Sequence, residues 1–497
     1  MKNNIFVLKS FSPDELQSFT GWSLGDEAVK SGAEESGFLL DTFDWLLWQA
    51  ECVLFFSGSF LRLYRNGKTV SAEAVSAPKN YEDIPEGKLR ELVRMNTSPR
   101  ILEIKAQCAI KTDCFGIINE DGKTICRIRL STVSINDFSC LFAELMPLKG
   151  YDREGAMVQA ALEDQGGKRT LRSPIVHALR KSGLRPGAYS TSAEADCAPD
   201  APVADVLRDI LLKLLNIMEQ NEAGAAEGLD SEFLHDFRVA LRRSRSAFTM
   251  FKGVFPPEEH AYFRTKLSEL FSRTNSARDL DVYLRKIQEY RTLLPDDMRD
   301  DLMPVEKYLA RSRKKEHERI VSLLGSAEYA DLKAEWRSFL SHETHTEEGR
   351  RSVRDSAAEV IKKAYGRIYK EGRDLHGESP AEEIHRVRIG CKKLRYALEF
   401  FRTIFPEKAA DGVTKRLKRL QDALGAHQDY EVQREKLMYY TEEAAKRLKK
   451  PVSMSLASGY LARYLDELQK AEREKCLELI EDFVSAKTRG LINEMLK

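Results

Sequence analysis

The pattern of apolar and polar positions changes near residue 195. Before it, residues 61–75 (LRLYRNGKTVSAEAV) and 117–130 (IINEDGKTICRIRL) each place an Asn-Gly or Asp-Gly pair between partly alternating, β-prone runs. This arrangement is a strong short-range indication of a β-hairpin. Helical spacing follows at residues 155–163 and 175–182. The first part of the chain is therefore predicted to be β-rich, with closing helices.

From residue 203 to the end, apolar residues recur with the spacing of amphipathic helices. The clearest runs lie at residues 204–220, 235–251, 262–274 and 281–294. Between the two patterns, residues 184–202 are rich in Pro, Gly, Ser and Ala and show little periodicity, which is typical of a linker. The sequence thus predicts an α+β multidomain protein, with a β-rich domain at residues 1–183 and an all-α region after residue 202.

The helical region contains an internal repeat, because a constant shift of 150 residues aligns two long stretches without a gap. The pairs brought together include His235 with His385, Arg238 with Arg388, Arg242 with Lys392, Arg243 with Lys393, Arg245 with Arg395, Phe251 with Phe401, and Asp279 with Asp429. A period this long is typical of a helical bundle of about four helices. We therefore predict two similar bundles, at residues 203–345 and 346–497, that pack together.

A row of cations runs along one helix of each copy. His235, Arg238, Arg242 and Arg245 follow an i, i+3, i+7, i+10 spacing, and His385, Arg388, Lys392 and Arg395 repeat it. The apolar residues of each helix cluster about 90° away, so each row is predicted on the shoulder of a core face. On the following helices, Lys266, Arg273, Arg416 and Arg419 flank the apolar positions. A row of about 15 Å in a shared groove suits an extended anion.

The alternative is an ordinary solvated helix face whose cations pair with acids one turn away. Between His385 and Arg402, however, the only acid among the charged residues is Glu399. Bringing such rows together costs Coulomb energy unless a polyanion relieves it. Each histidine is either a neutral structural residue or a group that adds charge or a hydrogen bond. No Ser-His-Asp or paired-carboxylate arrangement is recognisable, which favours anion binding over catalysis.

Composition limits the other classes of function. The 497 residues include 79 basic and 78 acidic ones, a net charge of +1, so any basic site must be local. The eight cysteines are scattered without a C-x-x-C pair, which argues against a zinc site. With no long apolar run and no secretory signal, a cytoplasmic protein is expected, without a membrane partner or a cofactor.

The runs FLHDFRVALRRSRSAF and EIHRVRIGCKKLRYALEFF closely resemble the signature of the CHAD family, the conserved-histidine α-helical domain. SARDLDV and LQDALGAHQDYEV resemble its second recurring element, and the resemblance covers about residues 200–497. It implies two four-helix bundles related by a pseudo-twofold axis, around a basic surface or pore that binds inorganic polyphosphate. It also implies an association with polyphosphate granules. On this resemblance the anion-binding role falls to His235, Arg238, Arg242, Arg245, His385, Arg388, Lys392, Lys393 and Arg395.

The first part is similar to the CYTH family, a β-barrel tunnel that binds metal and hydrolyses triphosphates. LLDTFDWLLWQAECVLFFSGSFLRLYRNGKTV is similar to its Tyr-x-Asp-Thr strand and arginine-bearing hairpin, and LKGYDREGAMVQAAL resembles its closing segment. Its Glu-x-Glu-x-Lys strand matches IFVLK, where Ile5 and Val7 replace the glutamates and Lys9 remains. Arg127 and Arg129 stand where a later strand should carry carboxylates. Because divalent cations need oxygen ligands, the resemblance implies a degenerate barrel.

This degenerate domain is expected to serve as a scaffold, or to bind phosphate through Arg62, Arg65 and Lys9. The leading hypothesis for the whole chain is a non-catalytic polyphosphate-binding protein. One alternative is a metal-dependent tripolyphosphatase in the N-terminal half. The other is a nucleic-acid-binding protein, for which few aromatic side chains lie among the cations as stacking platforms.

Overall fold

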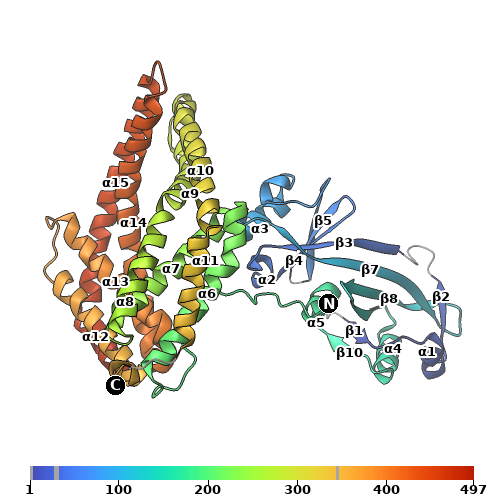
Figure 1. The fold of residues 1–497 in the computed structure, drawn as a ribbon. Helices are drawn as coiled ribbons and strands as arrows, with labels where there is room; N and C mark the ends of the chain where they lie inside the picture. The colour runs from blue at the N-terminus through green and yellow to red at the C-terminus, as the bar shows by residue number, and fades with distance from the viewer. Residues whose placement is uncertain (1–3, 27–32, 66, 343–345) are drawn as a thin grey trace. The chain divides into compact units, whose positions relative to one another are not determined.

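The computed structural model describes residues 4–26, 33–65, 67–342 and 346–497 (Figure 1). The chain divides into two compact units, Met1–Ser190 and Thr191–Lys497. The domain limits expected at residues 183, 202 and 345 stay predictions. The last of these limits falls on residues 343–345, which lie outside the described ones.

The first unit is built on one antiparallel sheet that forms a half-barrel. Its strands follow the order β10-β1-β9-β8-β7-β3-β4-β5-β6, and β2 pairs with β7 off this path. The strands are β1 (Ile5–Leu8), β2 (Ser23–Asp26), β3 (Ala33–Asp41), β4 (Cys52–Ser57), β5 (Phe60–Arg65), β6 (Lys68–Glu73), β7 (Glu103–Ile118), β8 (Thr124–Ile135), β9 (Phe138–Pro147) and β10 (Lys168–Thr170). The helices are α1 (Pro13–Thr20), α2 (Leu46–Gln49), η1 (Tyr81–Asp83), α3 (Lys88–Thr97), α4 (Asp152–Asp164) and α5 (Pro174–Lys181).

Both predicted hairpins are confirmed. Strands β5 and β6 pair with Arg65 opposite Lys68, and Asn66 of the predicted turn lies outside the described residues. Strands β7 and β8 pair up to Ile118 and Thr124, and Gly122 in their turn has a φ of 74°. A positive φ is accessible to glycine without a steric cost, so this Asp-Gly pair sets the turn. The two predicted closing helices correspond to α4 and α5.

The two faces of the sheet are covered by different helices. Alternate residues of β1 illustrate this, because Phe6 joins a cluster with α1 and α4, whereas Ile5 joins a cluster with α5. On the α5 face, Ile175, Ala178 and Leu179 pack against β4, β7, β8 and β9. That face of the half-barrel is therefore an apolar core.

The second unit is helical, as predicted. Its helices are α6 (Val203–Glu227), α7 (Ser231–Met250), α8 (Pro257–Arg273), α9 (Asn275–Leu293), η2 (Asp296–Leu302), α10 (Met303–Leu324), α11 (Ala327–Ser341), η3 (Glu348–Arg350), α12 (Val353–Gly372), α13 (Ala381–Phe401), η4 (Arg402–Ile404), α14 (Glu407–Ala445), α15 (Val452–Phe483) and α16 (Ala486–Met495). Three helices of the first copy, α6, α7 and α8, begin 150 residues before α12, α13 and α14.

The two copies pack around a pseudo-twofold axis. A residue contacts its own repeat counterpart only close to such an axis. The rings of Phe251 and Phe401 lie 5.3 Å apart, and Pro202 forms an isolated β-bridge with Ser352. Around that bridge the contacts are reciprocal, because the N–H of Val203 donates to Arg351 (2.9 Å) and the N–H of Val353 donates to Ala201 (2.8 Å). The predicted duplication is therefore confirmed in the fold.

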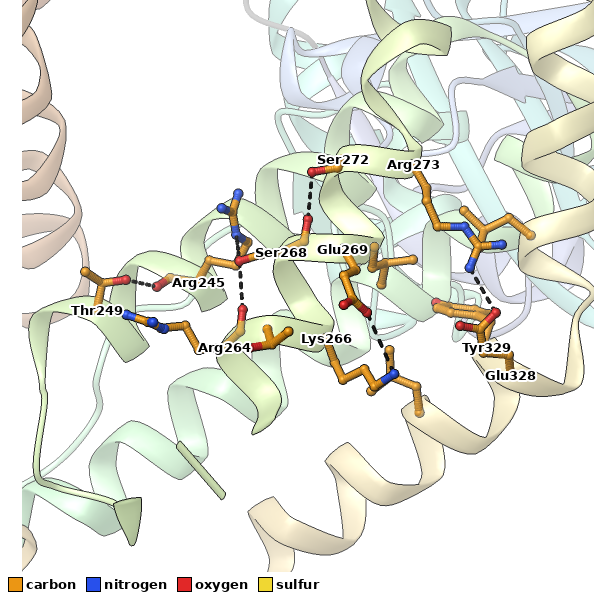
Figure 2. Close-up of a pocket in the computed structure, with 14 residues that line it drawn as sticks. Arg245, Thr249, Arg264, Lys266, Ser268, Glu269, Ser272, Arg273, Glu328 and Tyr329 are labelled. Atoms are coloured by element: carbon orange, nitrogen blue, oxygen red, sulfur yellow. Dashed lines mark hydrogen bonds and ion pairs between the residues drawn. The ribbon is translucent and has the colours of Figure 1, made fainter. Parts of the chain in front are cut away.

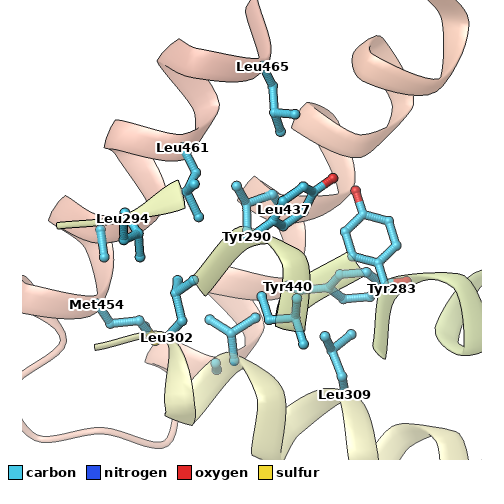
Figure 3. Close-up of a cluster of buried hydrophobic side chains, with 14 of the residues drawn as sticks. Tyr283, Tyr290, Leu294, Leu302, Leu309, Leu437, Tyr440, Met454, Leu461 and Leu465 are labelled. Carbon is cyan, nitrogen blue, oxygen red and sulfur yellow. The ribbon is translucent and has the colours of Figure 1, made fainter. Parts of the chain in front are cut away.

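A shared core joins the copies farther along the axis (Figure 3). It contains Tyr283, Tyr290 and Leu309 from the first copy with Leu437, Tyr440 and Leu465 from the second. The hydroxyl of Tyr283 donates to the carbonyl of Gln433, its repeat counterpart. The two copies therefore share a hydrophobic core and form a single compact unit around the pseudo-twofold axis. Among the described residues, no helix combines the length and the apolar character needed to cross a membrane.

Candidate anion-binding site

The two cation rows lie on α7 and α13, whose apolar faces are buried as predicted. Asp230 accepts hydrogen bonds from the N–H groups of Glu232 and Phe233 and so caps the start of α7. The apolar residues predicted to face the core, Leu234, Phe237, Leu241, Phe248, Phe251, Ile384, Val387, Cys391, Leu398 and Phe401, are all buried. The arginines and the lysine of both rows are half-buried beside them. They therefore stand on the shoulder of the core.

The two rows approach each other, because the charge of Arg242 on α7 acts on both Arg388 and Lys392 on α13. The pKa of Lys392 is lowered to about 8, mainly by burial and in addition by the charges of Arg388, Arg242 and Arg395, while Asp429 opposes the change. Burial also lowers the pKa of Arg388, with Asp429 raising it and Arg242 lowering it. Because Arg242 and Lys392 are repeat counterparts that act on each other, the centre of the two rows lies on the pseudo-twofold axis.

In the part of the chain that the structure describes, these three axial cations lack acidic partners at contact distance. Among the described residues, no carboxylate oxygen lies within the 4.0 Å ion-pair distance of Arg242, Arg388 or Lys392. The Nε atom of Arg242 is buried without a hydrogen-bond partner in the same described set. A buried, unpaired nitrogen and neighbouring like charges both cost free energy. An anion placed on the axis would offset the repulsion among these like charges.

Arg238 makes different contacts from its counterpart Arg388. Its guanidinium donates to the Phe271 carbonyl (3.1 Å), to the Thr274 hydroxyl and to Asn275 Oδ1 (2.9 Å). It also lies 4.3 Å from the centre of the Phe271 ring. Thr274 is the single residue between α8 and α9. Arg238 therefore holds the junction of these two helices.

The two histidines lie in different surroundings. His235 is half-buried, and burial together with the charge of Arg278 lowers its pKa to about 4, so it is neutral at pH 7. His385 is exposed, with Nδ1 2.8 Å from Gln428 Oε1. Of the two interpretations left open by the sequence, added positive charge at neutral pH does not apply to His235.

The remaining candidate cations surround the axial group unequally. Arg245 donates through Nε to Ser268 (3.1 Å), and Arg395 pairs with Glu399 (3.3 Å). Arg243 also pairs with Glu399 (2.9 Å) and donates to the Thr191 carbonyl, while Lys393 is half-buried. Arg416 is turned toward α15 and α16, where it contacts Asp482 (2.7 Å) and Thr488 (3.3 Å), and Arg419 is exposed. Arg395 thus acts on the axial cations, Arg245 lies beside Arg238 on the Phe271 ring, and Arg416 is directed elsewhere.

Lys266 and Arg273 line a separate cavity of about 960 Å³ on the first copy (Figure 2). Each has an acidic partner, with Lys266 Nζ 3.7 Å from Glu269 and Arg273 3.0 Å from Glu328. The cavity also contains Arg245 of the row and Arg264, which the sequence analysis did not select. The sequence carried no signal for Arg264, because it is brought to Arg245 by the packing of α7 against α8, where Ser268, one helical turn after Arg264, contacts Arg245.

In the first unit, Ile5 and Val7 belong to the apolar cluster on the α5 face. Arg62 pairs with Glu35, and Lys9 is exposed. Arg65 and Arg129 line a cavity of about 570 Å³ together with Lys68, Arg172 and Arg180, and Arg129 pairs there with Glu144 (2.7 Å). Arg127, opposite Met146 on β9, is exposed. The three cations proposed for phosphate are therefore not gathered in one place.

Asp41 of the Asp-Thr pair has a structural role. Its carboxylate accepts hydrogen bonds from the N–H groups of Thr42 (2.7 Å), Leu47 (2.9 Å) and Trp48 (2.9 Å), which caps α2. Burial raises its pKa to about 6, and the three N–H donors and Lys105 oppose this rise.

Comparisons with known proteins agree with the geometry of the second unit. The family model described as the CHAD domain matches residues 209–438. Two uncharacterized proteins of Mycobacterium tuberculosis, MT2285 and Rv2226, are 27% identical over 260 residues, which cover 50% of this chain and 48% of each relative. The chain thus matches about half the length of these curated relatives. The crystal structure of the CHAD domain from the plant Ricinus communis is similar with a TM-score of 0.50 and 26% identity, over 60% of this chain and 96% of that one.

Proposed function

Because residues 209–438 form a CHAD domain, we propose that the second unit binds inorganic polyphosphate without catalysis. The N-terminal half-barrel is consistent with a CYTH-like domain. The ligand lies on the pseudo-twofold axis between α7 and α13. Its oxygens accept hydrogen bonds from Arg242, Arg388 and Lys392. Arg245 extends the contact on the side of the first copy, and Arg395 flanks the axial cations on the other side, where it is paired with Glu399.

The observation that carries this proposal is the group of unpaired cations on the axis. Three cations from two helices lie close enough for their charges to act on one another, without an acid at contact distance in the described part of the chain. Guanidinium groups donate to phosphate oxygens through two N–H groups at once, and a lysine adds a point charge. A linear chain of phosphates presents charge at regular intervals, so it fits a row of cations better than a single small anion does.

Affinity in this proposal comes mainly from charge neutralisation and release of counterions, so it decreases as salt increases. The protein acts in the cytoplasm, at polyphosphate granules. Polyphosphate is the partner, and no cofactor takes part.

Competition between polyanions tests the identity of the ligand. Labelled long-chain polyphosphate is displaced from the full chain by unlabelled polyphosphate, single-stranded DNA or single-stranded RNA at equal phosphate concentration. We expect polyphosphate to compete at least tenfold better, because the phenylalanines of α7 and α13 are buried and offer no stacking surface to bases. Equal or better competition by either nucleic acid would favour the nucleic-acid alternative.

The enzyme alternative has its own test. The full chain is incubated with tripolyphosphate and Mg²⁺ or Mn²⁺, and released phosphate is measured. No release above the rate without protein is expected, since Ile5 and Val7 place apolar side chains where carboxylates would have to bind the metal. Metal-dependent release that requires the first unit's basic cavity, at Arg65, would revive the tripolyphosphatase.

A further inference from the structure

The two ends of the axial cation group differ, although the two copies are related by duplication. In the second copy, Glu399 contacts both Arg395 (3.3 Å) and Arg243 (2.9 Å). The residue at the equivalent position of the first copy, 150 residues earlier, is Thr249. Thr249 is exposed and its hydroxyl donates to the carbonyl of Arg245 in its own helix (2.9 Å). Arg245 thus has a neutral neighbour where Arg395 has a carboxylate.

The cavity on the first copy begins at this neutral end. Figure 2 shows Arg245 and Arg264 together near Thr249, whereas Lys266, Glu269 and Arg273 lie farther along α8, where Arg273 meets Glu328 of α11. No acid pairs with Arg245 or Arg264 among the described residues. Ser268 holds the Nε of Arg245, and the Phe271 ring lies 4.7 Å from the same guanidinium. The terminal nitrogens of Arg245 are therefore oriented by fixed neighbours.

The second copy lacks the residues that make this end of the cavity. Arg264 corresponds to Thr414, and Phe271, beside Arg245, corresponds to Gln421, which donates instead to the Cys391 carbonyl (2.6 Å). A phosphate that approached Arg395 would lie beside the carboxylate of Glu399, which is 3.3 Å from Arg395. Two neighbouring anions repel each other. The side of the axis formed by the second copy is thus closed to an extended anion.

We propose that the polyphosphate track is one-sided: from the axis it continues over the first copy to a subsite between Arg245 and Arg264, and Glu399 blocks its continuation over the second. This inference rests on the proposed function and adds where a long chain leaves the axis. Glu269 and Glu328 do not occupy this subsite, because they pair with Lys266 and Arg273 farther along the cavity, whereas Glu399 contacts Arg395 itself. A short chain fills the axis alone, whereas a longer chain also reaches Arg264.

The length of the polyphosphate ligand distinguishes binding at the axial cations from binding at the subsite beside Arg264. Affinities for tripolyphosphate and for long-chain polyphosphate are measured by titration calorimetry on the full chain. Arg264→Ser is expected to weaken long-chain binding about fivefold and to change tripolyphosphate binding less than twofold, since one partly exposed charge-assisted contact is lost. The matched control is Arg463→Ser, which removes an exposed arginine of α15 outside both the axial group and the cavity.

The blocking role of Glu399 predicts a gain of affinity. Glu399→Thr, which copies the first half of the repeat, is expected to strengthen long-chain binding about fivefold. Glu399→Gln keeps the shape of the side chain and is expected to act in the same direction, which covers the case in which the threonine variant folds poorly. The control Glu467→Thr removes an exposed glutamate of α15 and corrects for the change in net charge.

The outcomes distinguish this inference from the proposed function. If long chains do not bind the unmodified protein, the proposed function fails. If long chains bind, but Arg264→Ser equals Arg463→Ser and the Glu399 variants equal Glu467→Thr, the one-sided track is overturned and the axial site stands. Weaker long-chain binding by Arg264→Ser, together with stronger long-chain binding by the Glu399 variants, supports the one-sided track.

Discussion

At the scale of single residues, Lys392 couples anion binding to protonation. Burial and the charges of Arg388, Arg242 and Arg395 hold its pKa at about 8 in the free protein, against the effect of Asp429. A bound polyanion favours the charged form, so its pKa rises and a proton is taken up on binding above pH 8. Affinity is therefore expected to fall between pH 7 and pH 9, approaching tenfold per pH unit above the free pKa.

The measurement is the dissociation constant of long-chain polyphosphate at pH 7, 8 and 9 at constant ionic strength. Lys392→Arg keeps the charge throughout this range, so its affinity is expected to be nearly constant with pH. A pH dependence that persists unchanged in the arginine variant would show that another group is responsible.

The counterparts Arg238 and Arg388 are expected to respond differently to substitution. Arg238→Ala leaves the Phe271 carbonyl and two polar side chains of the α8–α9 junction without their donor, so the free energy of unfolding should fall by about 2–4 kcal/mol. Arg388→Ala removes a repelled cation and should leave that free energy nearly unchanged, while polyphosphate binding weakens about 10–100-fold.

Urea unfolding and binding titrations on both variants check this division. Arg238→Lys should not restore stability, because a lysine cannot reproduce the planar fork of donors, whereas Arg388→Lys should retain part of the binding. Equal losses of stability in both alanine variants would contradict the assignment.

The sequence predicts which cations share a face but not what each one contacts. The rows follow from helical spacing, which is local. The partners of Arg238 lie 33 to 37 residues away, and Asp482 lies 66 residues from Arg416, so these contacts depend on tertiary packing. This is why Arg416 entered the candidate list and Arg264 did not.

At the scale of elements, local signals predict the hairpins and helices well. The pairing of β1 with β9 and β10 carries no such signal, because it joins residues more than 130 positions apart. The break at Thr274 is also hard to anticipate. Its counterpart lies inside the continuous helix α14, where Leu424 and Gly425 replace Thr274 and Asn275. Similar sequences thus give one interrupted and one uninterrupted helix.

A substitution in helix α5 tests whether the first unit contributes to polyphosphate binding. Leu179 is buried between α5 and the sheet, so Leu179→Ala leaves a cavity and should destabilise the first unit by about 2–4 kcal/mol. Because the binding residues belong to the second unit, polyphosphate affinity should not change. Leu171→Ala, at an exposed position, is the control for stability and should have little effect. A loss of affinity in the well-folded Leu179→Ala protein would place part of the binding site in the first unit.

At the scale of the whole molecule, duplication explains why a nearly neutral chain carries a local cation cluster. Helices α7 and α13 each carry one row of cations, and the pseudo-twofold axis brings Arg242 near Lys392. The repeat in the sequence predicts two similar bundles, and counterparts in contact, such as Phe251 with Phe401, place the axis. The sequence alone cannot show that the axis crosses the cation rows, because that depends on how the bundles pack.

The most direct test of the axial site is the affinity for long-chain polyphosphate at several salt concentrations, measured on the unmodified protein and on the double variant Arg242→Ser with Lys392→Ser. Arg463→Ser with Lys470→Ser removes the same charge from exposed positions of α15 and serves as the control. We expect the axial variant to bind about 100-fold or more weakly, with a salt dependence reduced by about two counterions. Affinity and salt dependence equal to those of the control variant would contradict it.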